Sequence, residues 1–581
     1  MTRTLIPGKD RALEESIERL GATILELGYH IEEARWLNPA PHIWSVHIRD
    51  RDCPRVFANG KGGCREAALA SAYGELLERL GTRYLWADFM LHPVAAEFGF
   101  VHQADERWFD ADEGAPWPDD LLDANWRTRY IDGTGLTPAD LLDMNGGGSG
   151  KGLCALPYQR QSDGETVQVP VNLIANLFVS NGMSAGNTRD EAQVQGLSEV
   201  FERAIKQRIL TAPLTLPKVP DAVLARYPAI AEGLDSLNRH GFAVRALDAS
   251  LGGRYPVMCV LLQHPDGGVF ASFGAHPRFG VALERALTEL LQGRALDELA
   301  GFPPPTADIE LVRDPHNLEL HFIDSSGHVH WSLLGETPDH PFADWDAHPP
   351  WPDDNPAARD ALIRLLADEG FDTYIAEHTD LGAYACRILV PGFSDVYEAD
   401  ELLWDNNNFA LPVRDILFDL PGAGPEGWEA LLAALEEHHL NDQLRLFEWA
   451  GIAGDPETAW ARLRVGELRV WLLLALKRPE EAVEQLPSVL ASGHLSDNER
   501  LDLRALLAVL ELMVDGPGVD DFGPALLAWF GSERLAAARS WAEGRTVFPG
   551  LEALDPAAPS RAHATLLEAY RKVLRRQVRS S

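Results

Sequence analysis

The sequence predicts an α+β protein in which a mixed α/β body is followed by an all-α region. Segments with strand-like alternation and segments with helical periodicity are interspersed through about residue 415. Proline and glycine cluster at 419–428, in DLPGAGPEGW, and strand signals stop there. From residue 426 onward the pattern is that of successive helical hairpins. We therefore expect two domains, residues 1–418 and residues 426–581.

The first half of the body contains helix and strand signals in alternation. Residues 10–30 repeat apolar side chains with a period of roughly 3.6, which predicts an amphipathic helix. IWSVHIRD at 43–50 alternates as a strand does, and 56–86 indicates a strand, a glycine turn and a long helix. VQVPVNLIANLFV at 167–179 is rich in β-branched and aromatic residues, so we expect mainly strand there.

The second half of the body continues this pattern. Residues 187–210 predict a long helix, and 255–277 predict a hairpin that turns at PDGG. Residues 278–299 predict another helix. We expect substantial antiparallel strand pairing in this α/β body.

The sequence pattern of the all-α region resembles that of tetratricopeptide arrays. Residues 456–476, 477–492 and 497–514 each predict one arm of a helical hairpin, although no clean period of about 34 residues is present. Stacked helix pairs of this kind bind peptides or form dimers. Many large apolar residues lie in this region, including Trp428, Trp449, Trp460, Trp471 and Trp529. Because such apolar area exceeds what one small domain can bury, we expect a homodimer formed through this domain.

Bulk composition indicates a globular cytoplasmic protein. Hydrophobic residues make up 46% of the 581 residues and charged residues 24%. No apolar run reaches the roughly 18 residues of a transmembrane helix, and no signal-peptide pattern is present. The five cysteines lie far apart without a CxxC pair, which argues for a reducing compartment and against a zinc site. We therefore expect no membrane partner.

The net charge of −37 constrains the partners of this protein. A surface that binds the phosphates of nucleic acid needs clustered Lys and Arg. A chain this acidic should repel bare RNA and DNA, so we expect no direct nucleic-acid binding. The small basic cluster in YRKVLRRQVRSS is interpreted as a helix end with favourable charge.

One glycine-rich segment imitates a phosphate-binding loop. NGGGSGKGL at 145–153 has the Gly-Lys pair of the P-loop pattern. Asn145 stands where that pattern needs its first glycine, and Gly152 stands where it needs Ser or Thr. Because the magnesium-binding hydroxyl is missing, we interpret this segment as a mobile glycine loop rather than a P-loop.

Paired glutamates form a more informative pattern. Glu75 and Glu78 lie three residues apart in GELLERL, and Glu199 and Glu202 repeat that spacing in LSEVFERA. Residues three or four apart share one helix face, so each pair concentrates like charges. One interpretation is a solvated face with each glutamate paired to a nearby arginine. The other is a cation site, because the flanking sequence is apolar and buried carboxylates need a positive partner.

If the carboxylates bind a cation, its chemistry follows from the ligands. No histidine stands at di-iron spacing, so all-oxygen ligation favours magnesium, which usually sits against substrate phosphates. Arg203 and Arg285, on the glutamate helices, could grip phosphate oxygens. Thr188 and Glu191 match a capping box, and Asn187 lies at the N-terminus of the helix, where anion binding is favoured. The pattern indicates a nucleoside triphosphate site built from helix faces.

Three long sequence blocks contain these residues and resemble a known family. GKGGCREAALASAYGELLERL, SNGMSAGNTRDEAQVQGLSEVFERA and SFGAHPRFGVALERALTELLQGR, in this order, resemble the signature blocks of the YcaO family. The resemblance covers about residues 1–415. The helical remainder resembles that of the bacterial subclass of this family, whose members are described as ribosomal protein methylthiotransferase accessory factors.

The resemblance implies an ATP-binding fold without a P-loop, in which ATP lies on magnesium ions. On that basis two sets of residues match family positions. The metal-binding set is Glu75, Glu78, Glu199 and Glu202. The set that contacts nucleotide or metal is Lys9, Ser16, Asn187, Glu191, Arg203, Arg285 and Glu289.

The resemblance also implies an activity and its alternatives. Family members use ATP to phosphorylate a peptide amide oxygen, which a nucleophile then displaces. This chain lacks the proline-rich tail typical of azoline-forming members. We therefore expect an accessory protein with ATP-hydrolysing or phosphoryl-transfer chemistry, which assists a radical-SAM methylthiotransferase acting on an aspartate of a basic small-subunit ribosomal protein. The alternatives are a self-sufficient amide-activating enzyme and a nucleotide-bound scaffold.

Overall fold

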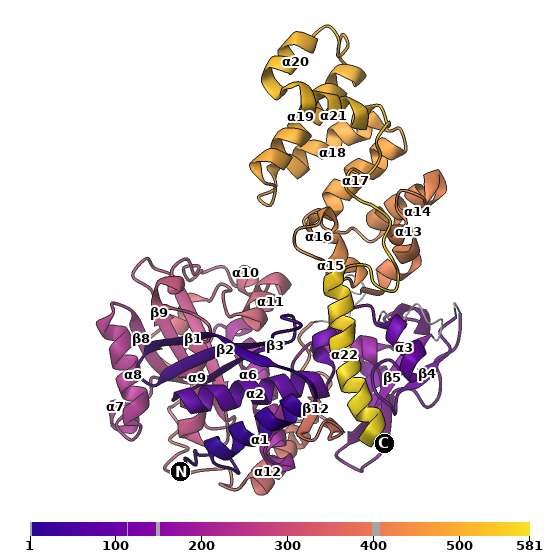
Figure 1. Cartoon of the computed structure of the whole chain (residues 1–581). Helices are drawn as coiled ribbons and strands as arrows, with labels where there is room; N and C mark the ends of the chain where they lie inside the picture. The colour runs from indigo at the N-terminus through magenta and orange to yellow at the C-terminus, as the bar shows by residue number, and fades with distance from the viewer. Residues whose placement is uncertain (1–2, 113, 144, 147–151, 398–406, 581) are drawn as a thin grey trace.

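The computed structural model places three antiparallel sheets in the body of the chain (Figure 1). It describes residues 3–112, 114–143, 145–146, 152–397 and 407–580. The first sheet has the order β1-β2-β3 and the second the order β10-β9-β8. The third has the order β4-β5-β11-β12-β7, with β6 paired to β5. The predicted antiparallel pairing is therefore confirmed.

The strands have the following bounds: β1 Ile31–Ala40, β2 Ile43–Asp50, β3 Phe57–Gly62, β4 Arg107–Phe109, β5 Leu153–Arg160, β6 Thr166–Pro170, β7 Met183–Gly186, β8 Ala243–Asp248, β9 Val257–Gln263, β10 Val269–Ala275, β11 Tyr374–His378 and β12 Tyr384–Leu389.

The helices of the body are α1 Leu13–Glu26, α2 Arg65–Gly81, α3 His92–Phe98, α4 Ala124–Tyr130, α5 Val171–Leu173, α6 Arg189–Thr211, α7 Asp221–Leu224, α8 Pro228–Arg239, α9 Phe279–Leu290, α10 Ile309–Arg313, α11 Pro315–Ile323 and α12 Asn355–Asp368. Those that follow are α13 Arg414–Phe418, α14 Gly424–Glu437, α15 Leu446–Ala450, α16 Ala459–Arg462, α17 Val465–Ala475, α18 Pro479–Ala491, α19 Asp497–Val514, α20 Gly523–Phe530, α21 Ser532–Ala542 and α22 Arg561–Ser580.

One predicted strand segment is helical instead. Residues 167–170 do form β6, but the chain then enters α5 and a π-helix at Ile174–Phe178. Leu173, Leu177 and Phe178 are buried in one core with Trp126. Because most residues of this short helix are apolar, its sequence cannot be told from a buried strand by periodicity. The expectation of mainly strand here was wrong for its second half.

Three long helices connect the sheets. α2 packs on β3 and also contacts β7, α6 packs on β7 and β12, and α9 packs on β10 and β9. Glycines permit the closest approaches. A Cβ added at Gly274 of β10 would lie 2.3 Å from the Ala286 backbone nitrogen of α9. The helix faces that are turned away from these sheets enclose the candidate site.

The described part of the region after the body contains helices and no named strand, as the sequence predicts, with one isolated bridge between Arg445 and Arg464. Its helices stack consecutively, with α17 against α18, α18 against α19 and α19 against α21. Figure 1 shows this stack rising away from the sheets. The fold is therefore α+β. The domain division at residues 418 and 426 stays a prediction.

The last helix returns to the body. α22 runs back alongside the sheets in Figure 1, and its Leu566, Leu567 and Tyr570 share one apolar core with Leu76 and Leu80 of α2. Hydrogen bonds fix this contact. The Tyr29 hydroxyl donates to the Ala569 carbonyl at 2.7 Å, and the Tyr570 hydroxyl donates to the Val101 carbonyl. α22 therefore completes an apolar core to which α2, the helix that carries Glu75 and Glu78, also contributes.

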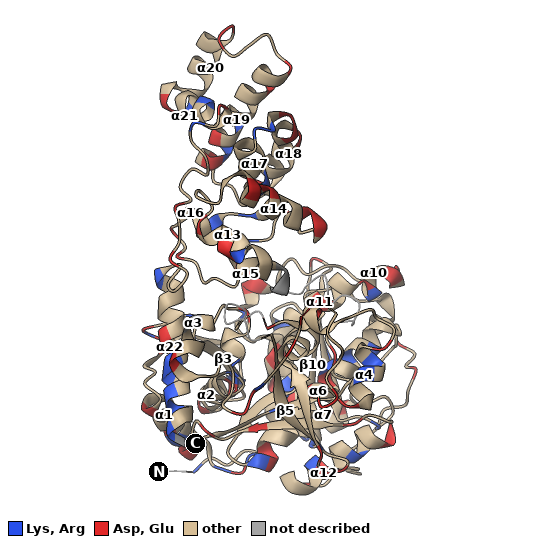
Figure 2. Ribbon diagram, turned by 90° about the vertical axis from the view of Figure 1, so that its right-hand side faces the viewer, with Lys and Arg blue, Asp and Glu red and all other residues tan. Residues whose placement is uncertain are grey.

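α22 also carries the basic cluster noted in the sequence. Figure 2 shows Lys and Arg along this helix. Arg571 pairs with Glu97 at 2.7 Å, and Lys572 lies 3.7 Å from Asp52 and 3.9 Å from Asp50. The cluster therefore forms ion pairs with the body. Among the described helices, none is both long and apolar enough to cross a membrane.

We predict that Tyr570→Ala weakens the body itself. The Tyr570 ring is fully buried, with its centroid 4.7 Å from that of Trp86. Deleting such a buried ring costs about 3–5 kcal/mol, so the melting temperature should fall clearly in a thermal scan. Val578→Ala is the matched control, because Val578 lies on the same helix and is 52% exposed. Equal melting temperatures for Tyr570→Ala and Val578→Ala would show that α22 does not stabilise this core.

Candidate nucleotide and metal site

A cavity of about 940 Å³ lies between α2, α6 and α9, and the segment before α1 contributes to its wall. All eleven residues that the sequence analysis singled out line this cavity. They are Lys9, Ser16, Glu75, Glu78, Asn187, Glu191, Glu199, Glu202, Arg203, Arg285 and Glu289. The fold therefore brings together residues that are up to 280 positions apart, taking Lys9 and Glu289 as the ends.

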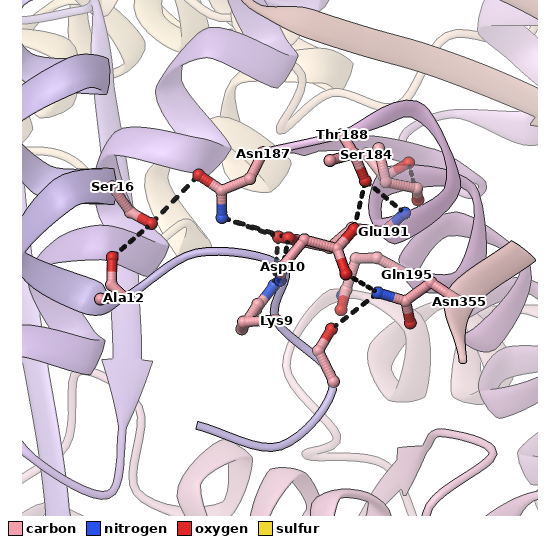
Figure 3. Close-up of polar contacts among 12 residues, drawn as sticks. Lys9, Asp10, Ala12, Ser16, Ser184, Asn187, Thr188, Glu191, Gln195 and Asn355 are labelled. Carbon is pink, nitrogen blue, oxygen red and sulfur yellow. Dashed lines mark hydrogen bonds and ion pairs between the residues drawn. The ribbon is translucent and has the colours of Figure 1, made fainter. Parts of the chain in front are cut away.

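At one end of the cavity the N-terminal segment is tied to the start of α6 (Figure 3). Lys9 Nζ lies 3.3 Å from Glu191 Oε1, and the Asp10 backbone N–H donates to Glu191 Oε2 at 2.9 Å. The Ser16 hydroxyl on α1 donates to Asn187 Oδ1 at 3.0 Å. Asn187 Nδ2 in turn donates to both carboxylate oxygens of Glu191. Four of the predicted residues thus form one hydrogen-bonded group.

Glu191 is the centre of that group. Only 3% of it is exposed. Burial alone would raise its pKa, but Lys9 and the hydrogen bonds from Asp10 and Asn187 outweigh burial and leave the pKa lowered. The capping box is half formed, since the Thr188 side chain accepts from the Glu191 N–H at 3.2 Å. The Glu191 carboxylate points to the cavity group, so it has a role that capping does not explain.

In the middle of the cavity two glutamates pair with arginines one turn along their own helices. Glu75 Oε1 lies 2.5 Å from an Arg79 nitrogen on α2. Glu199 Oε1 accepts from Arg203 Nε at 3.0 Å on α6. The simplest interpretation of the sequence pattern, a carboxylate paired with its nearby arginine, therefore holds for both. The faces concerned are turned to a cavity rather than to open solvent.

The third helix supplies two further pairs. Glu202 Oε2 accepts from the Ala275 backbone N–H at 3.1 Å and lies 3.7 Å from Arg285 of α9. Glu289, one turn further along α9, forms an ion pair with Lys61 of β3. Each of these glutamates therefore has a basic partner from a different element.

Glu78 differs from its neighbours. Among the described residues it forms no ion pair within 4.0 Å. Burial raises its pKa well above the ordinary value, and the nearby carboxylates of Glu199 and Glu75 add to that rise. Burial also raises the pKa of Glu75, against the effect of Arg79 and Lys61. Glu78 is thus less compensated than Glu75, which keeps its ion pair with Arg79.

The donor set fits magnesium, but the side chains are not arranged as a ready-made ion site. Carboxylates from α2 and α6 face one space, and oxygen ligands of this kind suit a hard divalent cation. Within the described residues, no three acidic, histidine or cysteine side chains lie close enough together to hold an ion. A bound ion would therefore have to replace the basic partners of Glu75, Glu199 or Glu202, whereas Glu78 has no ion pair to give up among the described residues.

Sequence reasoning missed several residues of the cavity wall. Lys61, Gln195, Lys206 and His276 all line it. Gln195 accepts from Arg285, and its position four residues after Glu191 and four before Glu199 was a signal that periodicity could have supplied. Burial lowers the pKa of Lys61 to about 8 and that of Lys206 to about 7.

His276 lines the cavity, and the structure describes only part of the glycine-rich segment. His276 is buried, burial holds its pKa well below the ordinary value, and its Nδ1 accepts from the Arg278 N–H at 3.0 Å. Residues 147–151 of the P-loop imitation lie outside the described part of the chain. Asn145 is buried and donates to the carbonyls of Ala87 and Phe89 at 2.7 Å, so it anchors a turn.

Comparison with known proteins gives the family. Residues 59–394 match the domain described as YcaO cyclodehydratase, ATP- and Mg²⁺-binding, and residues 410–579 match the YcaO cyclodehydratase C-terminal domain. The chain is 45% identical over 99% of its length, and over 99% of the relative's length, to the Escherichia coli protein named "Ribosomal protein S12 methylthiotransferase accessory factor YcaO". It is 44% identical over 98% of both chains to an uncharacterized protein of Haemophilus influenzae.

Solved structures give weaker similarities. The structure of YcaO from Methanopyrus kandleri bound with AMPPCP and Mg²⁺ is 19% identical, with a TM-score of 0.42, over 68% of this chain and 95% of that one. A heterocyclase in complex with substrate and cofactor is 17% identical, with a TM-score of 0.48, over 68% and 54%. The family assignment rests on the sequence matches: this chain belongs to the YcaO family, whose domain binds ATP and Mg²⁺.

We predict that Glu78→Gln stabilises the protein at neutral pH in EDTA. A carboxyl whose folded pKa is raised stabilises the fold at low pH, and this contribution is lost as pH rises above the ordinary value of 4.5. Glutamine imitates the protonated form, so the variant should melt above wild type at pH 7 and approach it as pH falls toward 5. Glu191→Gln is the opposite control, because the pKa of Glu191 is lowered. A lower melting temperature for Glu78→Gln at pH 7 would contradict the prediction.

Proposed function

We propose that this YcaO-family chain binds ATP and Mg²⁺ in the cavity between α2, α6 and α9 and assists the β-methylthiolation of an aspartate in a small-subunit ribosomal protein. The methylthiotransferase would be a separate radical-SAM enzyme. The observation that carries this proposal is the 45% identity over 99% of both chains with a relative named as an accessory factor of that reaction. The gathering of all eleven predicted residues around one cavity supports it.

In this proposal the cavity residues divide into two groups. Glu75, Glu78, Glu199 and Glu202 would hold Mg²⁺. Lys9, Ser16, Asn187, Glu191, Arg203, Arg285 and Glu289 would contact the nucleotide or support those ligands. Mg²⁺, when bound, would neutralise the charge of the phosphates.

The protein's own side chains would prepare this binding. Arg203 and Arg285 are held over the cavity by Glu199 and by Gln195, so their guanidinium groups can turn from carboxylate to phosphate oxygens without a change of backbone. The hydrogen-bonded group around Glu191 joins the segment before α1 to the N-terminus of α6. That tie fixes the cavity wall on which Lys9 and Ser16 lie.

The proposed partners follow from charge. A surface with a net charge of −37 suits docking onto a basic ribosomal protein better than onto RNA. We therefore propose the methylthiotransferase and its ribosomal protein substrate as protein partners, with no direct nucleic-acid contact. We place the protein in the cytoplasm, where ribosomal proteins are modified. All five cysteines are free, which supports a reducing compartment.

The region after residue 425 is proposed as the site of self-association. Trp529 on α20 is 81% exposed, and Leu527 and Phe522 beside it are 49% and 45% exposed. Exposed apolar residues gathered on one element are typical of an interface. We propose a two-fold dimer formed through this tip, and we keep residues 1–418 and 426–581 as the proposed domains.

A self-sufficient enzyme that activates a peptide amide is the second candidate, and the cyclodehydratase description of the matched domains favours it. In that case the purified chain should hydrolyse ATP in response to its own acceptor peptide. An accessory protein should hydrolyse ATP only with the methylthiotransferase and the ribosomal protein present. A scaffold should bind MgATP and hydrolyse it in neither mixture. One hydrolysis assay with these additions therefore separates the three.

We predict that Glu199→Gln abolishes the function while the fold survives. The change keeps side-chain shape but removes a charge beside Glu78, so MgATP affinity should fall at least about tenfold in calorimetric titration. In a strain whose own gene is deleted, wild type should restore methylthiolation of ribosomal protein S12, measured by mass spectrometry, and the variant should not. Gln207→Glu, on an exposed part of α6, is the control. Unchanged MgATP affinity in Glu199→Gln would refute the assignment.

We predict that Trp529→Ser makes the protein monomeric. The substitution removes the most exposed large apolar side chain of the described tip, so dimer affinity should fall with little effect on folding. Light scattering at micromolar concentration measures the mass of both proteins. MgATP binding should be the same in both, because the tip lies far from the cavity in Figure 1. A wild-type chain that runs as a monomer would refute the dimer.

A further inference from the structure

Lys61 is a cavity residue to which neither the sequence analysis nor the proposed function gives a role. It lies on β3 between Gly60 and Gly62, in the segment GKGG. Both glycines face α2 at very close range. A Cβ at Gly60 would lie 1.9 Å from the Ala68 carbonyl oxygen, and a Cβ at Gly62 would lie 2.6 Å from Ala67 Cβ. Because strand side chains alternate, Lys61 points to the opposite face, where it lines the cavity.

The contact of Lys61 differs in kind from those of the arginines. Arg79 and Arg203 pair with glutamates one turn away on their own helices. Lys61 crosses from β3 to α9, where it pairs with Glu289. It also lies in the field of Glu202, Glu75 and Glu199. Its ammonium group is a compact charge on a flexible stem, so it can exchange partners more freely than a planar guanidinium held by several hydrogen bonds.

The cavity as a whole is balanced in charge. Eight carboxylates line it, and so do eight lysine or arginine side chains. The protein outside this cavity therefore carries the whole net charge of −37. A divalent cation entering such a space alone meets carboxylates of which most already have a basic partner, Glu78 and Glu284 being the exceptions among the described residues. A nucleotide brings several phosphate charges, which give the basic side chains an alternative partner.

We infer that Lys61 excludes divalent cations from the cavity carboxylates unless a nucleotide accompanies them, so that Mg²⁺ and ATP bind as a pair. Lys61 keeps Glu289 and the adjoining glutamates compensated until phosphate oxygens attract its ammonium group. The carboxylates are then available to the ion. This inference rests on the proposed function, since it assumes that the cavity glutamates are the metal ligands.

The test measures binding of Mn²⁺ alone, because Mn²⁺ prefers the same oxygen ligands as Mg²⁺ and is visible by electron paramagnetic resonance. Wild type is compared with Lys61→Met, which keeps the length of the side chain and removes its charge, and with Lys61→Arg, which keeps the charge. The double variant Lys61→Met/Glu289→Gln removes both members of the pair. Thermal scans with and without Mn²⁺ provide a second readout that does not depend on activity.

A second lysine supplies the matched control. Lys206 lines the same cavity, but its Nζ donates to the His321 carbonyl at 2.5 Å and to the Ser325 hydroxyl at 2.7 Å, not to a carboxylate. At a pH below the pKa of about 7 that burial gives Lys206, Lys206→Met therefore removes a positive charge without freeing a glutamate from an ion pair. It separates the particular effect of Lys61 from a general change in cavity charge.

Lys61→Met should bind Mn²⁺ without nucleotide at least about tenfold more tightly than wild type, since an uncompensated carboxylate gains most from a cation. Its melting temperature should be lower than that of wild type and should be restored by Mn²⁺. Lys61→Arg and Lys206→Met should behave as wild type does. The double variant should lose most of the gain in Mn²⁺ affinity, because Glu289 no longer carries a charge.

Three results would overturn the inference. Wild type could bind Mn²⁺ alone as tightly as Lys61→Met does, Lys61→Met could gain no affinity, or Lys206→Met could gain as much as Lys61→Met. A parallel titration with MgATP keeps this failure distinct from failure of the proposed function. If wild type binds MgATP and any of these three results is found, only the inferred role of Lys61 is refuted. Wild type that binds no MgATP removes the proposed nucleotide site as well.

Discussion

The need to compensate carboxylates on helices that are otherwise core is the constraint on which the rest of this structure depends. α2, α6 and α9 each bury one face against a sheet and turn glutamates to a shared cavity on the other. An isolated ionised carboxylate in such a place is strongly unfavourable, so every such group needs a cation or several hydrogen bonds. The chain meets this need with a basic residue for nearly every acid, from the same helix, from a neighbouring strand or from the N-terminal segment.

This constraint explains why much of the site could be predicted from sequence. Glu75 with Glu78 and Glu199 with Glu202 interrupt apolar helices with charges on one face, which local sequence shows directly. The helices themselves were equally readable, since α2, α6 and α9 have strong periodicity and β9 and β10 flank an obvious turn. The site needed the family resemblance to connect blocks that lie far apart in the chain. Periodicity alone could not say that the three helix faces meet.

What sequence could not supply is set by tertiary packing. Lys61 looks like an ordinary strand lysine until the close approach of Gly60 and Gly62 to α2 shows which way it must point. Residues 171–178 carry the composition of a strand, and their helical conformation depends on packing Leu173, Leu177 and Phe178 into one core with Trp126. Individual ion-pair partners are equally invisible, because Glu289 of α9 meets a strand more than 200 residues earlier in the chain. These are contacts between distant segments, which no local pattern encodes.

The return of α22 to the body has a consequence for synthesis of the chain. Leu76 and Leu80 on the back of α2 belong to a core that Leu566, Leu567 and Tyr570 complete. While a ribosome is still making the helical region, Leu76 and Leu80 have Leu20, Ile24 and Trp86 in the same core but lack the residues of α22, and the contacts that complete this core span nearly the whole sequence. Such non-local contacts form late, and until they form they leave aggregation-prone apolar surface exposed. The apolar core behind α2 is therefore complete only after α22 has been made, and a product that lacks α22 leaves this apolar surface uncovered.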